Sequence, residues 1–356
     1  MVVSISSALP LKAALSRSLL NMLSRAVWGA GLALCILLSA CSAQADPAWD
    51  AYRERFVSGD GRVIDTGNRN ISHSEGQGWG MMLAQHYNDQ ETFEELWQWT
   101  RRHLGRRDMS LFSWRYDPND KPHVRDLNNA TDGDLFIAWA LHLAAERWND
   151  ANYASASRSI RGAIVENLTT EVAGYQLLLP GVEGFRRTNE ADINLSYWFI
   201  PALRDFAELE PDEPWQQLID DGVTLLDKAR FGAYLLPTDW VEINQQGNVT
   251  PAANWPPRFS FDAVRIPLYF VWGGRDDASG VGSITAFWND PAHQPASAWI
   301  DVVSGERAEY AISRGVDAIR AFSSGETLPN AMPSPEDDYF SATLLLLAHM
   351  ANDMRP

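Results

Sequence analysis

Residues 133–148 read GDLFIAWALHLAAERW, and apolar side chains dominate this stretch. Leu135, Ala138, Trp139 and Leu143 recur at spacings of three and four, which is the period of one buried helix face. The stretch therefore predicts an amphipathic α-helix that packs against a hydrophobic core.

The same periodicity recurs on both sides of this stretch. Further helices are predicted over residues 48–57, 78–87, 92–104, 153–167, 198–207, 214–230, 308–322 and 338–351. Strand signals are short and look like pieces of hairpins. They lie at 175–179 and at 240–244 with Val249, and the second hairpin turns at 245–247. We expect an all-α chain of roughly a dozen helices with small β-hairpin excursions.

Residues 1–41 have the pattern of a signal peptide. Lys12, Arg17 and Arg25 are the only charged residues in this segment, and residues 26–40 are almost wholly apolar but too few to span a membrane comfortably. Two cleavage sites fit, and we favour the first. Residues 38–41, LSAC, resemble a lipobox that would place a lipid on Cys41, whereas residues 43–45, AQA, fit an ordinary signal peptidase.

Either site predicts a periplasmic or secreted protein. With the lipobox, the protein would be anchored to the outer membrane as a lipoprotein and would touch the membrane only through that anchor. Beyond Asp46 no linker or low-complexity tract interrupts the chain, so residues 46–356 are expected to form one domain. Both cysteines, Cys35 and Cys41, lie in the leader, which leaves no disulfide in the mature domain.

The net charge excludes one class of partner. It is −17 for the whole chain, and without the three basic residues of the leader it becomes −20, from 26 basic and 46 acidic residues. Such a surface repels phosphate backbones, so we expect no nucleic-acid partner, whereas a neutral polymer is compatible with it.

The first candidate for chemistry is residues 72–81, SHSEGQGWGM. Ser72 and Glu75 have the spacing of a helix capping box, which is the purely structural interpretation. Three glycines in ten residues instead indicate that something approaches the backbone closely. Trp79 beside Glu75 would raise the pKa of that carboxyl by desolvation, as a general acid requires.

Two more stretches carry acidic residues. Residues 128–134, NNATDGD, can open a helix with Thr131 or Asp132 as its cap, but the two asparagines exceed what a cap needs. In residues 258–267, RFSFDAVRIP, Asp262 and Arg265 share a helix face. That pair is either an ordinary surface ion pair or a partly buried one in which the arginine keeps Asp262 ionised.

Fifteen tryptophans are many for this length, and most will fill the core. Trp79, Trp114, Trp198 and Trp240 stand beside polar residues, where an aromatic ring can stack on the apolar face of a sugar. No His/Cys cluster has metal-ligand spacing and no phosphate-binding loop is visible, so neither a metal nor a cofactor is expected. Paired carboxylates with many aromatics fit glycoside hydrolysis best.

Residues 74–81, 130–134 and 261–267, in this order, resemble the signature blocks of glycoside hydrolase family 8, and the resemblance extends from about Trp49 to Ala351. It implies an (α/α)6 barrel with an open cleft that hydrolyses β-1,4-linked glucan with inversion. Within the family the chain is similar to the endoglucanases that accompany bacterial cellulose synthase, which implies a functional association with that complex.

The resemblance also implies roles for single residues. Glu75 would be the general acid, Asp262 the general base, and Asp132 the residue that binds and distorts the sugar at the cleavage point. Tyr197 would help to hold the attacking water. Further substrate contacts are expected from residues Trp79, Trp114, Arg265 and Tyr339.

Two alternatives remain open from the sequence. A chitosanase, xylanase or lichenase would keep the fold and change the polymer. A non-catalytic glycan-binding lipoprotein would keep the cleft but lose at least one catalytic carboxylate, and both candidates, Glu75 and Asp262, are present.

Overall fold

The computed structural model describes residues 46–355. Eleven α-helices lie within this part of the chain. Their bounds are α2 Pro47–Phe56, α3 Ser74–His86, α4 Gln90–His103, α5 Thr131–Trp148, α6 Ala151–Leu168, α7 Ile200–Leu209, α8 Trp215–Lys228, α9 Ile266–Trp272, α10 Ser279–Asn289, α11 Arg314–Ser323 and α12 Tyr339–Asp353. The leader and Cys41, with the predictions made for them, lie outside the described residues, and the domain start at residue 46 stays a prediction.

The strands are short and pair only in antiparallel fashion. They are β1 Ser72–His73 with β2 Arg115–Tyr116, β3 Thr169–Val172 with β4 Tyr175–Leu178, β5 Glu190–Ile193 with β6 Val241–Asn244 and β7 Val249–Pro251, and β8 Arg258–Phe259 with β9 Ile300–Asp301. Three 3-10 turns, η1 Leu195–Tyr197, η2 Ala263–Arg265 and η3 Pro291–His293, complete the elements. The mainly helical chain with hairpin excursions is as predicted.

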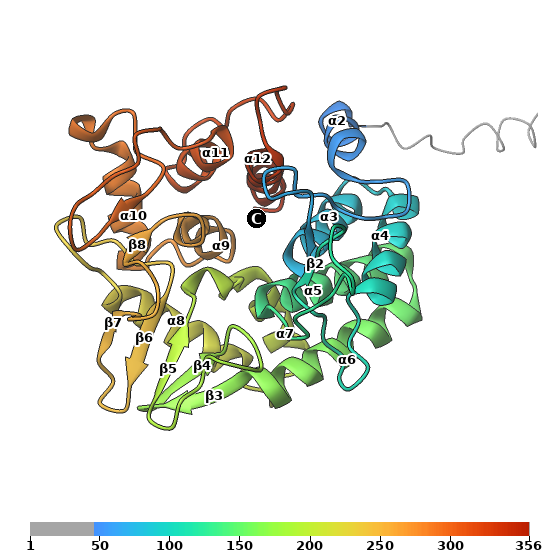
Figure 1. Ribbon diagram of the computed structural model, residues 1–356, viewed down its shortest axis with the longest axis horizontal. Coiled ribbons are helices and arrows are strands. Elements are labelled where there is room, and N and C mark those ends of the chain that lie inside the picture. The colour runs from blue at the N-terminus through green and yellow to red at the C-terminus, as the bar shows by residue number, and fades with distance from the viewer. Residues whose placement is uncertain (1–45, 356) are drawn as a thin grey trace, which may run out of the picture. The chain divides into compact units, whose positions relative to one another are not determined.

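Six helices form a closed inner ring. In the order α3, α5, α7, α9, α11 and α12 each helix contacts the next, and α12 contacts α3 again (Figure 1). The remaining helices, α2, α4, α6, α8 and α10, pack on the outside of this ring. Alternation of inner and outer helices is the plan of an (α/α)6 barrel, and here residues 324–338 join α11 to α12 without an outer helix.

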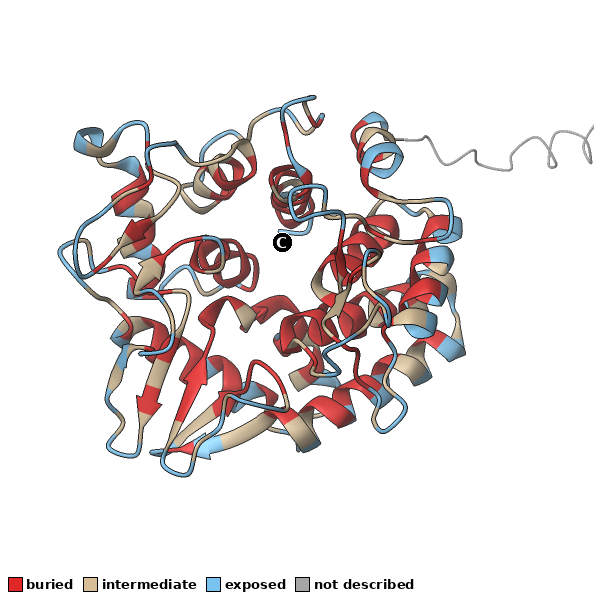
Figure 2. Ribbon diagram, viewed as in Figure 1, coloured by how far each residue is buried: buried red, intermediate tan, exposed pale blue. Residues whose placement is uncertain are grey.

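Three of the inner helices, α3, α9 and α12, are buried almost all round (Figure 2), whereas α7 and α11 each keep one side less buried. Every residue of α9 is buried, and in α3 only Glu75 and His86 are not. A helix that is apolar on all sides belongs inside a protein, whereas α4 and α8 have one polar face and lie outside. Since Glu75 is one of the two exceptions in α3, the ring wall opens to solvent where this carboxyl stands.

Two glycines let α3 and α5 approach each other unusually closely. A Cβ at Gly78 would lie 2.5 Å from the Cβ of Phe136, and one at Gly133 would clash with the Ser74 hydroxyl and lie 2.7 Å from the Glu75 nitrogen. Atoms of a neighbouring helix therefore account for the close approach that the glycines of residues 72–81 predicted. This contact brings the first turn of α5 against the first turn of α3.

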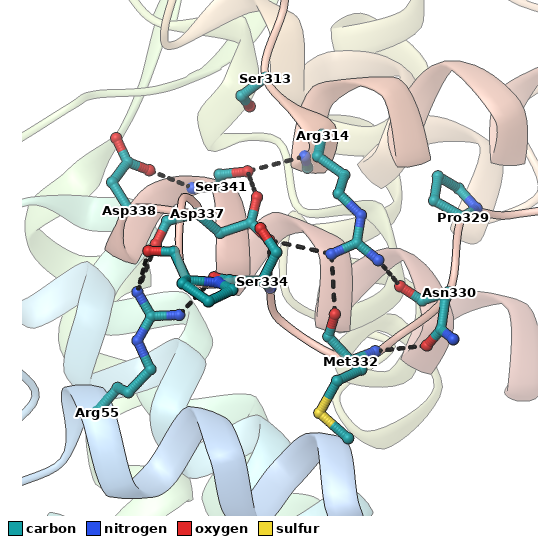
Figure 3. Close-up of polar contacts among 12 residues, drawn as sticks. Arg55, Ser313, Arg314, Pro329, Asn330, Met332, Ser334, Asp337, Asp338 and Ser341 are labelled. Atoms are coloured by element: carbon teal, nitrogen blue, oxygen red, sulfur yellow. Dashed lines mark hydrogen bonds and ion pairs between the residues drawn. The ribbon is translucent and has the colours of Figure 1, made fainter.

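The irregular link between α11 and α12 is fixed by two arginines (Figure 3). Arg55 of α2 donates to the Ser334 carbonyl at 2.6 Å and to the Asp337 carbonyl at 2.8 Å. Arg314 of α11 donates to the Asp337 carboxylate at 3.0 Å. Because α2 begins the described chain and α12 ends it, these bonds tie the two ends of the barrel together.

Among residues 46–355 there is no helix whose length and apolar character would allow it to cross a membrane.

The close α3–α5 contact predicts opposite effects for two glycine substitutions. Gly78→Ala should lower the free energy of unfolding by about 1–3 kcal/mol, because the added methyl group overpacks the helix interface. Gly162→Ala is the matched control, since this exposed glycine in α6 has no atom within 4 Å of its would-be Cβ. It should raise stability by about 0.5–1 kcal/mol through helix propensity alone. Urea unfolding of both variants measures the two free energies of unfolding. Equal stabilisation by the two changes would contradict the packing described.

Candidate active site

Arg265 lies at the centre of three carboxyl groups. Its side chain is 2% exposed, and Nη1 donates to the Glu75 carboxylate and lies 3.6 Å from Asp132 Oδ2. Nη2 donates to Asp262 Oδ1 at 2.6 Å. One planar guanidinium thus holds Glu75 and Asp262 on two different nitrogens, so the residues of the three sequence blocks meet in one site.

The carboxyls stand on elements that fix their backbone. Glu75 and Asp132 are the second residues of α3 and α5, the two helices that the glycines bring together, and Asp262 directly precedes η2. Asp132 does not cap α5, because the residue before that helix, Ala130, makes no side-chain capping bond. The cap interpretation of this stretch is therefore wrong, and Asp132 faces Glu75 instead.

Asp132 is the carboxyl that retains a proton. Burial, and then the charge and hydrogen bond of Glu75, raise the pKa of Asp132 well above its ordinary value. Its Oδ1 accepts the Gly133 N–H at 2.8 Å, but its buried Oδ2 accepts no hydrogen bond from any described residue. An oxygen without a donor is where a carboxyl proton can reside, so Asp132 can donate to Glu75 and the pair shares one proton.

The pKa of Glu75 differs from the prediction. Burial raises it, but the Arg265 guanidinium, the hydrogen bond from Asp132 and the nearby His73 together bring it below its ordinary value. The rise expected from desolvation is therefore present but outweighed, and the Trp79 ring lies 5.5 Å from the Arg265 guanidinium carbon. The proton available to Glu75 is therefore stored on its partner Asp132.

Opposing effects set the pKa of Asp262. Burial raises it, the Arg265 guanidinium lowers it, and the charge of Glu75 raises it again, so that it lies above its ordinary value. Arg265 thus favours the ionised form of Asp262, which is the direction that the sequence pattern suggested. A carboxylate with a raised pKa is a stronger proton acceptor when it is ionised. Its side chain is 31% exposed, which leaves it accessible from solvent.

His73, which sequence reasoning did not assign, supports Glu75. It caps α3, because its Nδ1 accepts the Gly76 N–H at 3.0 Å, and this replaces the capping box expected from Ser72 and Glu75. The same Nδ1 lies 3.9 Å from Glu75 Oε1, and Nε2 lies 3.6 Å from Asp65 Oδ2. The imidazole therefore connects Glu75 to a further carboxylate.

Tyr197 ends the turn η1. Burial, followed by the charges of Asp132, Asp262 and Glu75, raises the pKa of Tyr197 well above its ordinary value, so its hydroxyl feels all three carboxyls. Ser196 in the same turn accepts a bond from Arg265 Nη2 at 3.2 Å.

The predicted aromatic contacts divide into two groups. Trp114 is half-buried, and its backbone carbonyl accepts the Ser74 N–H at 3.0 Å, so its main chain lies beside the start of α3, while its ring nitrogen donates to Asp126. Trp79 and Tyr339 are buried, at 0% and 1% exposure. Neither ring therefore offers a face on which a sugar can stack, and the substrate contacts predicted for these two residues stay predictions.

Three aromatic rings that were not assigned line up near Tyr197. Trp240 stacks on Phe185 with ring centroids 5.5 Å apart and on Trp255 at 4.5 Å, and Tyr197 meets Trp240 edge-on. All four side chains are half-buried. The fold alone makes the rings of Phe185, Trp240 and Trp255 parallel, and of these only Trp240 had a signal in the sequence, through its polar neighbours.

The arrangement supplies both halves of acid–base chemistry. A carboxyl pair with a shared proton stands next to a carboxylate with a raised pKa, so the site holds a proton donor and a proton acceptor around one guanidinium. Two carboxyls in these roles are the requirement for hydrolysis of a glycosidic bond.

Comparisons with known proteins agree with this chemistry. Residues 20–354 match the family model described as glycosyl hydrolases family 8. An endoglucanase of Cellulomonas uda is 42% identical over 286 residues, which cover 80% of this chain and 79% of that protein.

Solved structures give the same result. An endo-β-1,4-glucanase from an Achatina fulica gut metagenomic library superposes with a TM-score of 0.83 at 40% identity, over 88% of this chain and 99% of that one. An endo-β-1,4-glucanase from Acetobacter xylinum superposes with a TM-score of 0.81 at 38% identity, over 87% and 97%.

The proton on Asp132 predicts a pH-dependent stability. Folded Asp132 binds its proton more tightly than the unfolded chain does, so its contribution to stability is fully present below about pH 4 and is lost as the pH rises toward the folded pKa. Asp132→Asn mimics the protonated carboxyl and removes this loss. Its Tm should equal that of the unsubstituted protein near pH 4 and exceed it increasingly toward pH 8. A Tm difference that stays constant over this range would show that Asp132 is not protonated in the fold.

Proposed function

The chain belongs to the glycosyl hydrolases of family 8, and we propose that it is an inverting endo-β-1,4-glucanase that acts on cellulose-type glucan. The observation that carries the proposal is the placement of Glu75 and Asp262 on two nitrogens of the buried Arg265. The endoglucanases to which the chain is similar support the choice of substrate.

Glu75 acts as the general acid. Asp132 transfers the shared proton along their hydrogen bond, and Glu75 donates it to the oxygen of the bond that breaks. The guanidinium of Arg265 then stabilises the carboxylate that Glu75 leaves behind. A sugar that loosens the bond between Glu75 and Arg265 would raise the pKa of Glu75 and so move the proton to it.

Asp262 acts as the general base. As a carboxylate it removes a proton from a water molecule that attacks the anomeric carbon from the side opposite to the leaving group. Single displacement of this kind requires the two carboxyl groups to stand roughly 6.5–9.5 Å apart so that the water fits between them. Tyr197, close to all three carboxyls, is suited to hold that water, and Asp132 to bind the distorted sugar.

The stacked rings of Phe185, Trp240 and Trp255 support a sugar polymer as the substrate. Half-buried aromatic faces beside a hydrolytic site suit pyranose rings, which stack on them through their apolar C–H faces. The strong negative charge adds no attraction for a neutral glucan, and it leaves chitosan, a cationic polymer, as the alternative to be tested.

Location and association are separate proposals. The leader pattern supports export, and the resemblance to enzymes that accompany cellulose synthase supports action on glucan chains during their synthesis. Finding the protein in the cytoplasmic fraction of its own cells would rule out both.

Glu75→Gln should lower turnover on carboxymethylcellulose by about 10²–10⁴-fold, because glutamine keeps the shape of the side chain and has no proton to transfer. Glu91→Gln is the matched control, since Glu91 is the second residue of α4, as Glu75 is of α3, but is exposed to solvent. It should leave turnover unchanged, and reducing-end release measures both.

Viscosity and a panel of polymers separate the alternatives. An endoglucanase lowers the viscosity of carboxymethylcellulose well before most bonds are broken. Faster release of reducing ends from chitosan or xylan than from β-1,4-glucan would overturn the assignment of substrate. Full turnover by Glu75→Gln would overturn the assignment of the general acid.

A further inference from the structure

Asp262 stands at a position where an aspartate side chain ordinarily accepts a hydrogen bond from the backbone. It directly precedes the 3-10 turn η2, and an aspartate at such a position usually accepts a backbone N–H of the turn with its own side chain. Asp262 makes no such capping bond. Its carboxylate instead accepts the Nη2 bond of Arg265 at 2.6 Å, which is the contact that places it in the active site.

A second carboxylate, that of Asp239, accepts backbone N–H groups on both sides of Asp262. Asp239 Oδ1 accepts the Ala263 N–H at 2.9 Å and the Ser260 N–H at 3.0 Å. Its Oδ2 accepts the hydroxyl of Ser260. The two N–H groups bracket Phe261 and Asp262, so Asp239 fixes the backbone on both sides of the proposed general base.

Asp239 is itself firmly placed. Its N–H donates to the carbonyl of Arg258 at 2.8 Å. The hydroxyl of Thr238, the preceding residue, donates to the carbonyl of Trp240, the following one, at 2.7 Å. Burial, followed by the charge of Asp262, raises the pKa of Asp239 to about 7, so the two carboxyls lie close enough to influence each other. No step of the proposed reaction uses Asp239.

We propose that Asp239 is a positioning residue for the general base. By accepting the N–H groups of Ser260 and Ala263, it holds the backbone on both sides of Asp262, so that the Asp262 side chain binds Arg265 and faces the attacking water. This proposal rests on the proposed function, in which Asp262 is the base. In this role the oxygen atoms of Asp239 act as hydrogen-bond acceptors, and the negative charge of the carboxylate is not required.

Three substitutions distinguish an acceptor from a charge. Asp239→Asn keeps an oxygen at the position of Oδ1 and loses the charge, so kcat should stay within about threefold. Asp239→Glu keeps the charge but moves the carboxylate by one methylene group, so kcat should fall at least about 10-fold. Asp239→Ala loses both and should lower kcat about 100-fold, the effect of a displacement of about 1 Å in a catalytic group. KM should change less than about threefold in all three, since binding does not depend on the base.

Asp221→Ala is the matched control for loss of a buried carboxylate that accepts a backbone N–H. Asp221 is 8% exposed, and its Oδ2 accepts the backbone N–H of Gln176 at 2.8 Å and thus links α8 to β4. This substitution should lower the Tm without changing kcat or KM on cellohexaose.

A crystal structure of Asp239→Ala provides a readout that does not depend on activity. Its Asp262 carboxylate should turn to the Ala263 N–H and leave Arg265. If Asp262 stays on Arg265 in that structure, or if the glutamate variant is active and the asparagine variant inactive, the proposal is overturned.

If Asp239→Ala does not fold, the contrast in kcat between the asparagine and glutamate variants tests the proposal alone. An unsubstituted protein without activity on any glucan would refute the proposed function, whereas the position of Asp262 would still test the role of Asp239.

Discussion

A single buried cation holds the active site together. Removal of the Arg265 guanidinium from water costs several kcal/mol, and only well-placed carboxylates can offset that cost. Glu75 and Asp262 do so, and Asp132 is drawn into the same cluster. One positive charge cannot stabilise three ionised carboxyls in a site so poorly exposed to water, so the cluster keeps a proton, and Asp132, at 1% exposure the most deeply buried of the three, is where it resides. The supply of a proton donor next to a proton acceptor thus follows from the balance of charges around Arg265.

The barrel gives this cluster its geometry. Glycines at the α3–α5 interface allow the first turns of these helices to touch, which fixes the Glu75 and Asp132 carboxyls against each other. Both stand at helix N-termini, where the macrodipole favours negative charge and assists their ionised forms. Asp262 comes from the opposite part of the chain and needs different support: its 3-10 turn is too short to orient it, and bonds from Arg265 and around Asp239 supply the missing constraint.

The sequence predicted those features that local patterns determine. Long helices such as α5 and α6 were found within a few residues of their bounds, whereas α9 and α10 were missed. α9 is apolar on every side and therefore has no amphipathic period. Glu75, Asp132, Asp262 and Arg265 could be named because each lies in a continuous motif. The pKa shifts of Glu75 could not be predicted, since its partner Arg265 is 190 residues away in the chain. Asp239 gave no signal because the N–H groups that it accepts lie 21 and 24 residues further along the chain. The burial of Trp79 and Tyr339 could not be predicted, because neighbours in sequence do not reveal whether a ring faces the core or the solvent.

The central claim is that Glu75 and Asp262 act on one bond from opposite sides, as donor and as base. The most direct test is the configuration of the first product. Proton NMR of cellohexaose hydrolysis, recorded before mutarotation, resolves the α and β anomers of the newly formed reducing end. The account predicts that the α anomer appears first, because a single displacement at a β-linked carbon inverts it. An initial β anomer would mean that a carboxylate attacks the sugar directly, and would contradict the roles assigned to Glu75 and Asp262.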